Sequence, residues 1–177
     1  MAITIVTSDK IVSGGRWTNS ATSVKQSVSI ATGDPVMPPI DLGYTNGTGT
    51  AQCDLWYCKR RTLAANTTES LDLRGGLTDP EGNAINFAHV KRVVISILEP
   101  DGTKSLRVGP QNVTNAAQLW FGGTGATAYE TVKTFLYKDE PFTGWATTAG
   151  SADLLPVFNP SLTDAVTYGI WVLGTST

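Results

Sequence analysis

One histidine and two cysteines are the side chains of this sequence best suited to nucleophilic catalysis or metal binding. Nucleophilic catalysis needs a Ser or Cys served by a nearby base, and His89 is the only imidazole in the chain. It closely precedes Lys91 and Arg92, whose positive charges disfavour a protonated ring. We therefore expect His89 to be neutral, either partly buried or on the surface, and we predict no catalytic residue around it.

Cys53 and Cys58 are separated by four residues. If residues 52–60 form one strand, the two side chains point to opposite faces and lie about 16 Å apart, at a rise of roughly 3.3 Å per residue. A disulfide of normal geometry is then excluded, and Cys-x4-Cys is not a usual spacing for a structural zinc pair. We predict two buried thiols, no metal site and no cofactor.

Paired carboxylates could hydrolyse glycosidic bonds, but most acidic residues here lie beside Pro or Gly, where turn formation explains them. Asp72 is the exception, because it lies between Leu71 and Leu73 on a predicted strand, near Arg74. It could form an inward ion pair or cap a turn. A glycoside hydrolase acting through Asp72 is the third of three functional hypotheses.

Two short basic runs, Lys59-Arg60-Arg61 and Lys91-Arg92, could bind a charged partner. If the strands that carry them pair, the charges form one basic patch that suits a phosphate or an acidic protein surface. The alternative is that both runs are solvated strand ends. The net charge of −2 argues against nucleic acid as the main ligand.

The aromatic residues could line a sugar-binding groove, because aromatic faces stack on sugars. Trp56, Trp120, Trp145 and Trp171 lie in or beside predicted strands, where core packing is the commoner role. Trp17 lies instead in a polar N-terminal stretch. We expect it to be exposed or buried at a subunit contact.

The elements that must position these side chains are strands. From residue 51 onward, turn signals separate about eight short strands at spacings of roughly 8–15 residues. Residues 93–98 are the best strand, and Pro100-Asp101-Gly102 reads as a hairpin turn after it, so residues 105–108 should return antiparallel to it. The pattern predicts an all-β protein: an antiparallel β-sandwich, jelly roll or barrel with an extended N-terminal segment.

Two predicted strands carry large side chains on both faces. Residues 52–60 alternate so that both faces should be covered. Residues 167–173 place Tyr168, Ile170 and Val172 on one face and Trp171 and Leu173 on the other.

Residues 1–50 differ from the remainder, being rich in Ser, Thr and Gly and containing Pro38-Pro39, which cannot lie in the centre of a sheet. We therefore divide the chain into an N-terminal arm and extended connector, residues 1–50, and a β-sandwich or jelly-roll domain, residues 51–177. An extended arm is suited to reaching a neighbour. Its expected contact residues are Trp17, Val36, Ile40 and Tyr44.

The composition of the chain limits where the protein is expected in the cell and which classes of partner it is expected to bind. Only 16% of the 177 residues are charged, which gives a neutral, wet surface that does not steer a polyanion. The N-terminus lacks the basic and apolar regions of a secretion signal, and no window approaches the 18 apolar residues of a membrane span. We expect a soluble protein made in a cytoplasm, with neither nucleic acid nor membrane as a partner.

The sequence resembles small virion proteins of tailed bacteriophages over roughly residues 52–174. This group includes capsid decoration, or cement, proteins with β-barrel or jelly-roll folds. The resemblance implies a non-enzymatic protein that binds an assembled shell, often as a trimer at local symmetry axes. It rests on residues 57–73 (YCKRRTLAANTTESLDL), Leu77-Thr78-Asp79, Gly82, Val90-Lys91-Arg92, Val108-Gly109 and residues 168–174 (YGIWVLG).

The first hypothesis is therefore a protein on the capsid surface of a phage, made in the host cytoplasm, that decorates and stabilises the capsid. Its partners would be the major capsid protein and its own copies, with a homotrimer favoured. The expected contact residues are Trp17, Val36, Ile40, Tyr44, Lys59, Arg60, Arg61, Lys91 and Arg92. The alternative is a carbohydrate-binding β-sandwich of a tail fibre or lectin-like module, with exposed Trp or Tyr beside Asn and Asp in one groove.

Overall fold

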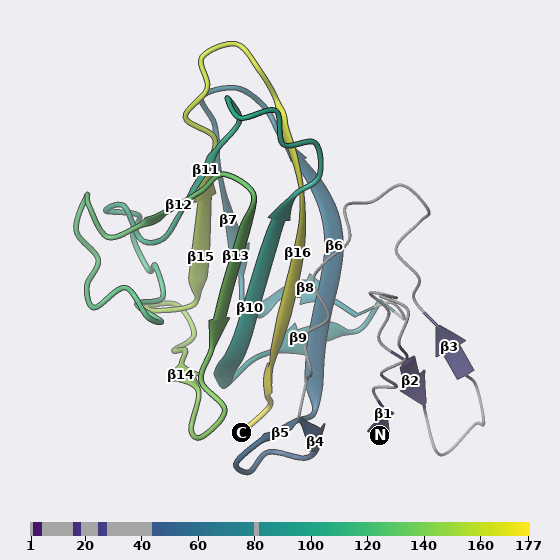
Figure 1. The fold of residues 1–177 in the computed structure, drawn as a ribbon. Helices are drawn as coiled ribbons and strands as arrows, with labels where there is room; N and C mark the ends of the chain where they lie inside the picture. Colours follow the sequence, from purple (N-terminus) through teal and green to yellow (C-terminus); the bar gives the residue numbers. More distant parts are fainter. Residues whose placement is uncertain (1, 5–15, 19–24, 28–43, 80–81) are drawn as a thin grey trace.

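Short alternating stretches build two antiparallel sheets that face each other, as the computed structural model shows (Figure 1). The structure describes residues 2–4, 16–18, 25–27, 44–79 and 82–177. These residues form strands, turns and loops and contain no helix. The predicted all-β sandwich is confirmed.

The larger sheet holds the longest strands of the chain. Its members are β6 (Leu55–Leu63), β10 (His89–Ile97), β13 (Phe135–Asp139), β14 (Trp145–Ala146) and β16 (Val166–Thr175). The order is β13–β10–β16–β6, and β14 pairs with one end of β10. The last strand of the chain therefore lies in the middle of this sheet, between β10 and β6.

The smaller sheet covers one face of the larger one. Its members are β7 (Thr68–Asp72), β11 (Leu106–Val108), β12 (Glu130–Val132) and β15 (Leu154–Phe158), in the order β12–β11–β15–β7. Shorter pairings complete the chain: β1 (Ala2–Thr4), β2 (Arg16–Thr18) and β3 (Lys25–Ser27) form one sheet, β4 (Thr45–Asn46) pairs with β5 (Gln52–Cys53), and β8 (Arg74–Thr78) pairs with β9 (Ala84–Asn86).

The main core fills the space between the two sheets. Tyr168, Ile170 and Val172 of β16 point into it, and Leu155 and Val157 of β15 meet them from the smaller sheet. Removing an aliphatic side chain of this size from water contributes about 1.5–3 kcal/mol. Trp171 and Leu173 pack on the opposite face of β16, so the predicted alternation of this strand is confirmed.

The predicted covering of β6 on both faces is also found, whereas the predicted placement of Cys53 and Cys58 on opposite faces is wrong, and Cys58 is half-buried where a buried thiol was expected. Tyr57 packs into the main core, whereas Trp56 and Cys58 lie on the outer face of the larger sheet. Asp54 lies between β5 and β6 and belongs to neither strand. This break shifts the alternation of side chains between the two faces, so that Cys53 lies on the same outer side as Cys58. The two cysteines form no disulfide with each other.

Residues 105–108 do not return beside the best strand, contrary to the prediction. Leu106–Val108 forms β11 in the smaller sheet, where it pairs with β12 and β15. Both sides of β10 are occupied by β13 and β16. Eight residues separate β10 from β11, and a connection of that length can cross between sheets about 10 Å apart instead of closing a two-residue hairpin.

Gly174 marks a point where β16 must approach other backbone closely. A Cβ atom built at Gly174 would lie 2.2 Å from the carbonyl oxygen of His89 and 2.6 Å from a ring carbon of Phe87. Chemical denaturation should show that Gly174→Ala lowers the free energy of unfolding by about 2–3 kcal/mol, because the sheet must open to accept the methyl group. Gly123→Ala is the matched control, since nothing lies within 4 Å of its Cβ. Equal stability of the two variants would contradict this prediction.

Candidate functional site

The outer face of the larger sheet, which points away from the smaller sheet, carries a second apolar cluster. Trp56 of β6 and Leu173 of β16 form its floor, and Tyr44 and Cys53 cover them from the preceding segment. Cys58 and Trp171 pack at its margin. Figure 1 shows β4 and β5 at the end of the sheet where β16 finishes. The chain therefore enters the sandwich across this face.

Tyr44 is fixed to the sheet by two charged residues, and we name Tyr44, Arg92 and Asp139 the Tyr44 anchor. The Tyr44 hydroxyl donates to Asp139 Oδ1 at 2.7 Å. Arg92 donates to both oxygens of the same carboxylate, from Nε at 2.8 Å and from Nη2 at 3.0 Å. The guanidinium carbon lies 4.7 Å from the centre of the Tyr44 ring and 5.2 Å from that of Tyr137. The guanidinium thus makes a bidentate ion pair and lies close to two aromatic rings.

Burial controls the protonation of these groups. Burial, and then the hydrogen bond and charge of Asp139, raise the pKa of the Tyr44 phenol above its usual value. Burial alone would raise the pKa of Asp139, but hydrogen bonds from Arg92 and Tyr44 outweigh it and hold that pKa below its usual value. Burial, followed by the charge of Asp54, raises the pKa of Cys53 to about 11. At neutral pH the cluster therefore holds a carboxylate, a neutral phenol and a neutral thiol. This arrangement is suited to holding the segment of Tyr44 and Cys53 on the sheet.

The segment before β6 is part of the sandwich, although its sequence groups with the N-terminal arm. The Lys91 ammonium donates to the carbonyl oxygen of Gly49, and Ala51 N–H donates to the carbonyl oxygen of Pro141 at 2.7 Å. Tyr44 is only 8% exposed. Residues 44–51 therefore pack with the sandwich, and the Tyr44 side chain is used inside its own chain. These contacts run across the predicted division at residue 51, and the burial of Tyr44 leaves little of its surface for the expected partner contact.

The five predicted basic residues do not form one exposed patch. The strands that carry them are both paired with β16 and lie on opposite sides of it. Lys91 and Arg92 are 1% and 3% exposed, so we remove them from the expected contact residues. Lys59 and Arg60 are exposed on β6, at the edge of the larger sheet.

Arg61, the fifth of these residues, joins the two sheets. Its Nε donates to Glu69 Oε2 on β7 at 2.7 Å, and its Nη1 donates to the Tyr57 hydroxyl at 2.8 Å. Tyr168 of β16 donates to the other oxygen of Glu69. Burial raises the pKa of Tyr168, and the hydrogen bond to Glu69 raises it further. Arg61 is thus half-buried in a network that ties β6 and β16 to the smaller sheet.

The remaining predicted contact residues lie in the N-terminal arm. Trp17 belongs to β2, which pairs with β1 and β3. Val36 and Ile40 lie outside the described residues. Their assignment to a partner contact stays a prediction.

Asp72 and His89 have structural contacts. Asp72 Oδ1 accepts a hydrogen bond from Arg74 N–H at 2.8 Å, which is the turn-capping role considered for it, while the Arg74 side chain donates to the carbonyl oxygen of Phe87. His89 is half-buried, with Nδ1 3.4 Å from the carbonyl oxygen of Thr177. Neither contact arranges a nucleophile with a base or a pair of carboxylates around a substrate.

The described tryptophans mostly pack against other side chains. Trp56 is buried. The ring of Trp120 lies 5.2 Å from that of Trp145 and 4.5 Å from that of Phe121, measured between centres, and the Lys138 ammonium lies 5.9 Å from the Trp120 ring. Tyr137 is the one described Trp or Tyr side chain that is exposed, at 38%, and it lies beside Asp139, so the aromatic groove of the carbohydrate alternative stays a prediction.

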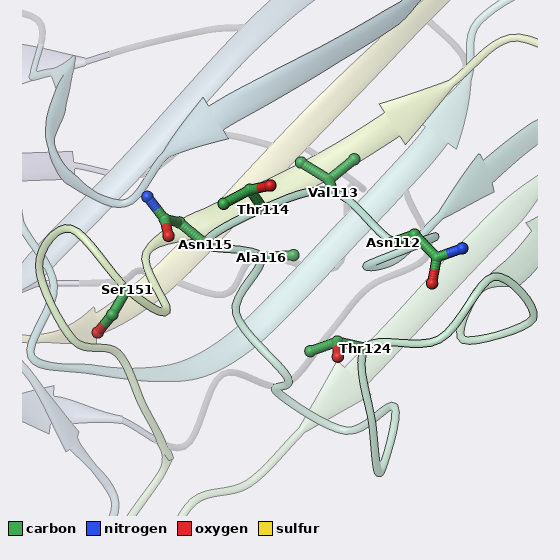
Figure 2. A pocket seen from close by; sticks show the side chains of 7 residues that line it. All are labelled: Asn112, Val113, Thr114, Asn115, Ala116, Thr124 and Ser151. Carbon is green, nitrogen blue, oxygen red and sulfur yellow. The ribbon is translucent and has the colours of Figure 1, made fainter.

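A polar pocket lies instead beside the connection between β11 and β12. Its volume is about 350 Å³. Figure 2 shows Asn112 and Thr124 toward one end, Asn115 and Ser151 toward the other, and Ala116 between them. Val113 and Thr114 complete the lining. The residue types that line it are amides, hydroxyls and small apolar side chains, without a charged group or an aromatic ring.

Two further observations bear on the kind of site. Within the described residues, no three His, Cys, Asp or Glu side chains come together in a way that could hold a metal ion. No helix in this part of the chain has the length and apolar character that crossing a bilayer requires.

Sequence reasoning missed two parts of these sites. Asp139 shows no signal in the sequence, because its partner Arg92 lies 47 residues earlier. The pocket residues have a weak signal, the Asn- and Thr-rich stretch 112–115. That stretch alone is equally typical of an ordinary loop.

Comparisons with known proteins add no relative: no protein-family model matches the chain, and no curated protein matches its sequence. The functional argument therefore rests on the residues and their geometry.

Proposed function

We propose that the protein is a non-enzymatic structural component of a bacteriophage virion that decorates and stabilises the capsid. The observation that carries this proposal is the Tyr44 anchor. The 43 residues before Tyr44 make up about a quarter of the chain, and they join the sandwich at a point held by an ion pair, a phenol hydrogen bond and two ring contacts. A firmly anchored N-terminal segment suits a protein that reaches a neighbouring subunit or the shell.

The polar chemistry of the described residues supports the same proposal. Arg61, Asp72, Arg92 and Asp139 could have served as reactive or ligand-binding groups, and each bonds to other parts of the chain. The exposed Lys59 and Arg60 lie on an edge strand. Charged side chains on an edge strand discourage unspecific pairing with another strand, so a partner would contact this edge through its side chains. With Trp17, Val36 and Ile40 they form the contact set of this proposal, in a homo-oligomer for which a trimer is favoured.

Immunogold electron microscopy of virions of the encoding phage tests the proposal. Antibodies against the purified chain should label the heads, because a decoration protein is displayed over the capsid surface, and pre-immune serum is the control. Labelling restricted to the tail fibres would overturn capsid decoration and favour the carbohydrate-binding alternative. Unlabelled virions, with the chain also absent from them by mass spectrometry, would overturn a virion role altogether.

A further inference from the structure

The connection between β11 and β12 is unusually long for this fold. It covers residues 109–129, or 21 residues without a helix or strand of its own. Most connections in compact domains have about 4–6 residues, and ordered loops longer than about 12–15 are uncommon and usually functional. This loop is tied in place: Asn112 N–H donates to the carbonyl oxygen of Thr124 at 2.9 Å, and Ala117 N–H donates to that of Leu154 at 2.7 Å. The loop therefore has one fixed conformation and presents an ordered surface.

The same loop concentrates unfavourable backbone conformations. Six described non-glycine residues have a positive φ, and four of them lie within these 21 residues. Leu119, at φ 40°, is a bulky residue for which this conformation is costly. Such conformations persist where the surrounding structure enforces them, and they cluster at ligand sites. The four residues are Gln111, Asn112, Asn115 and Leu119.

Two of the four, Asn112 and Asn115, line the pocket from opposite ends (Figure 2). The carbonyl oxygen of Asn115 accepts hydrogen bonds from Asp153 and Leu154 N–H, each at 3.0 Å. These bonds fix the loop against the segment that carries Ser151. The backbone at both ends is thus held by the fold, while the amide and hydroxyl side chains stay on an exposed surface.

The chemistry of the lining selects the class of ligand. Without a charged side chain the pocket offers no compensation for an ionic ligand, and its few apolar atoms disfavour a lipid. Asn amides donate and accept, and Ser and Thr hydroxyls do both, which matches a ligand that presents several neutral hydroxyl groups. The volume of about 350 Å³ lies at the lower end of the roughly 300–1,000 Å³ of small-molecule pockets, which suits one or two sugar rings.

We propose that this pocket binds a neutral saccharide, held by hydrogen bonds from the side chains of Asn112, Asn115, Thr124 and Ser151. Binding would depend on hydrogen bonds alone, without stacking on an aromatic ring. The proposal is independent of capsid decoration, because either can fail while the other holds. On a particle surface, such a site would bind neutral glycans.

Glycan-array binding of the full chain, followed by titration of its amide NMR signals with the strongest neutral hit, tests the proposal. At least one neutral glycan should bind, and saturable shifts should centre on residues 112–116, 124 and 151. The double variant Thr124→Val with Ser151→Ala removes two hydroxyls at little change in volume. It should raise the Kd of that glycan about tenfold, as the loss of two hydrogen bonds implies.

The matched control is Thr131→Val with Ser70→Ala, which changes the same residue types at exposed positions outside the pocket. It should leave the Kd unchanged, and both double variants should melt at the temperature of the natural protein. Three results would overturn the proposal: binding to no neutral glycan, binding only to charged glycans, or equal weakening by both double variants.

Discussion

Asn159→Asp should destabilise the fold more than any other single substitution considered for this protein. Asn159 is fully buried, and its side-chain amide donates to the carbonyl oxygens of Leu63, Ala64 and Asp164 at 2.8–3.1 Å. A carboxylate would bring negative oxygen against these three acceptors. A buried polar group left unpaired costs about 1–3 kcal/mol and a charged one more, so we expect a loss of about 4 kcal/mol at pH 7, measured by chemical denaturation.

The pH dependence of this loss separates charge from shape. Repulsion by the three carbonyl groups and burial should raise the folded-state pKa of the new carboxyl group above the roughly 3.9 of an unfolded chain. The penalty is therefore complete well above that raised pKa and shrinks as the pH falls toward 4, where the protonated group can donate. Asn46→Asp, on the exposed strand β4, is the control and should change stability little. A penalty under 1 kcal/mol, or one that does not shrink on acidification, would contradict the role assigned to Asn159.

Asp139→Ala should cause the second large loss, about 3 kcal/mol in the free energy of unfolding. Arg92 is 3% exposed and would be left as a buried cation with neither of its carboxylate bonds, while the Tyr44 hydroxyl would lose its acceptor. Removing one partner of a buried pair costs about 3–5 kcal/mol, and the partial exposure of Asp139 argues for the lower end. Asp164→Ala, at an exposed site, should cost under about 0.5 kcal/mol.

The same anchor predicts how acid affects the protein. Because the pKa of Asp139 is lower in the folded chain than its usual value, the carboxylate contributes stability above about pH 4, and this contribution is lost as the pH falls through the folded-state pKa. Stability measured from pH 6 to pH 2 should therefore decline less for Asp139→Ala than for the natural protein. If the stability of Asp139→Ala and that of the natural protein fell by the same amount over this pH range, protonation of Asp139 would not be the cause of the loss.

The strands were predictable because their alternation is local. Buried and half-buried positions alternate from residue 166 to residue 172 of β16, so the inward and outward sets of this stretch can be derived without knowing its neighbours. The identity of those neighbours could not be derived. The sheet that receives residues 106–108 depends on which strand edges are already occupied, and that is a property of the whole chain.

The sites were less predictable than the strands, for two physical reasons. A one-residue interruption at Asp54 moved Cys53 to the same side as Cys58, because a shift of one residue reverses every side chain of a strand. The Arg92–Asp139 pair and the pocket both join segments far apart in the sequence. In a single sequence, such pairings leave no local pattern.

The position of the Tyr44 anchor has a mechanical consequence. Tension that reaches Tyr44 from the N-terminal side enters the sandwich next to β4 and β5 and then passes along β6. That strand pairs with β16 at nine positions, from Leu55–Gly174 to Leu63–Val166. A pull directed along β6 would load this ladder in shear, so that many hydrogen bonds share the force instead of opening one after another. Under the proposed capsid role, a shell that swells or is compressed would load this ladder while the sandwich keeps its shape.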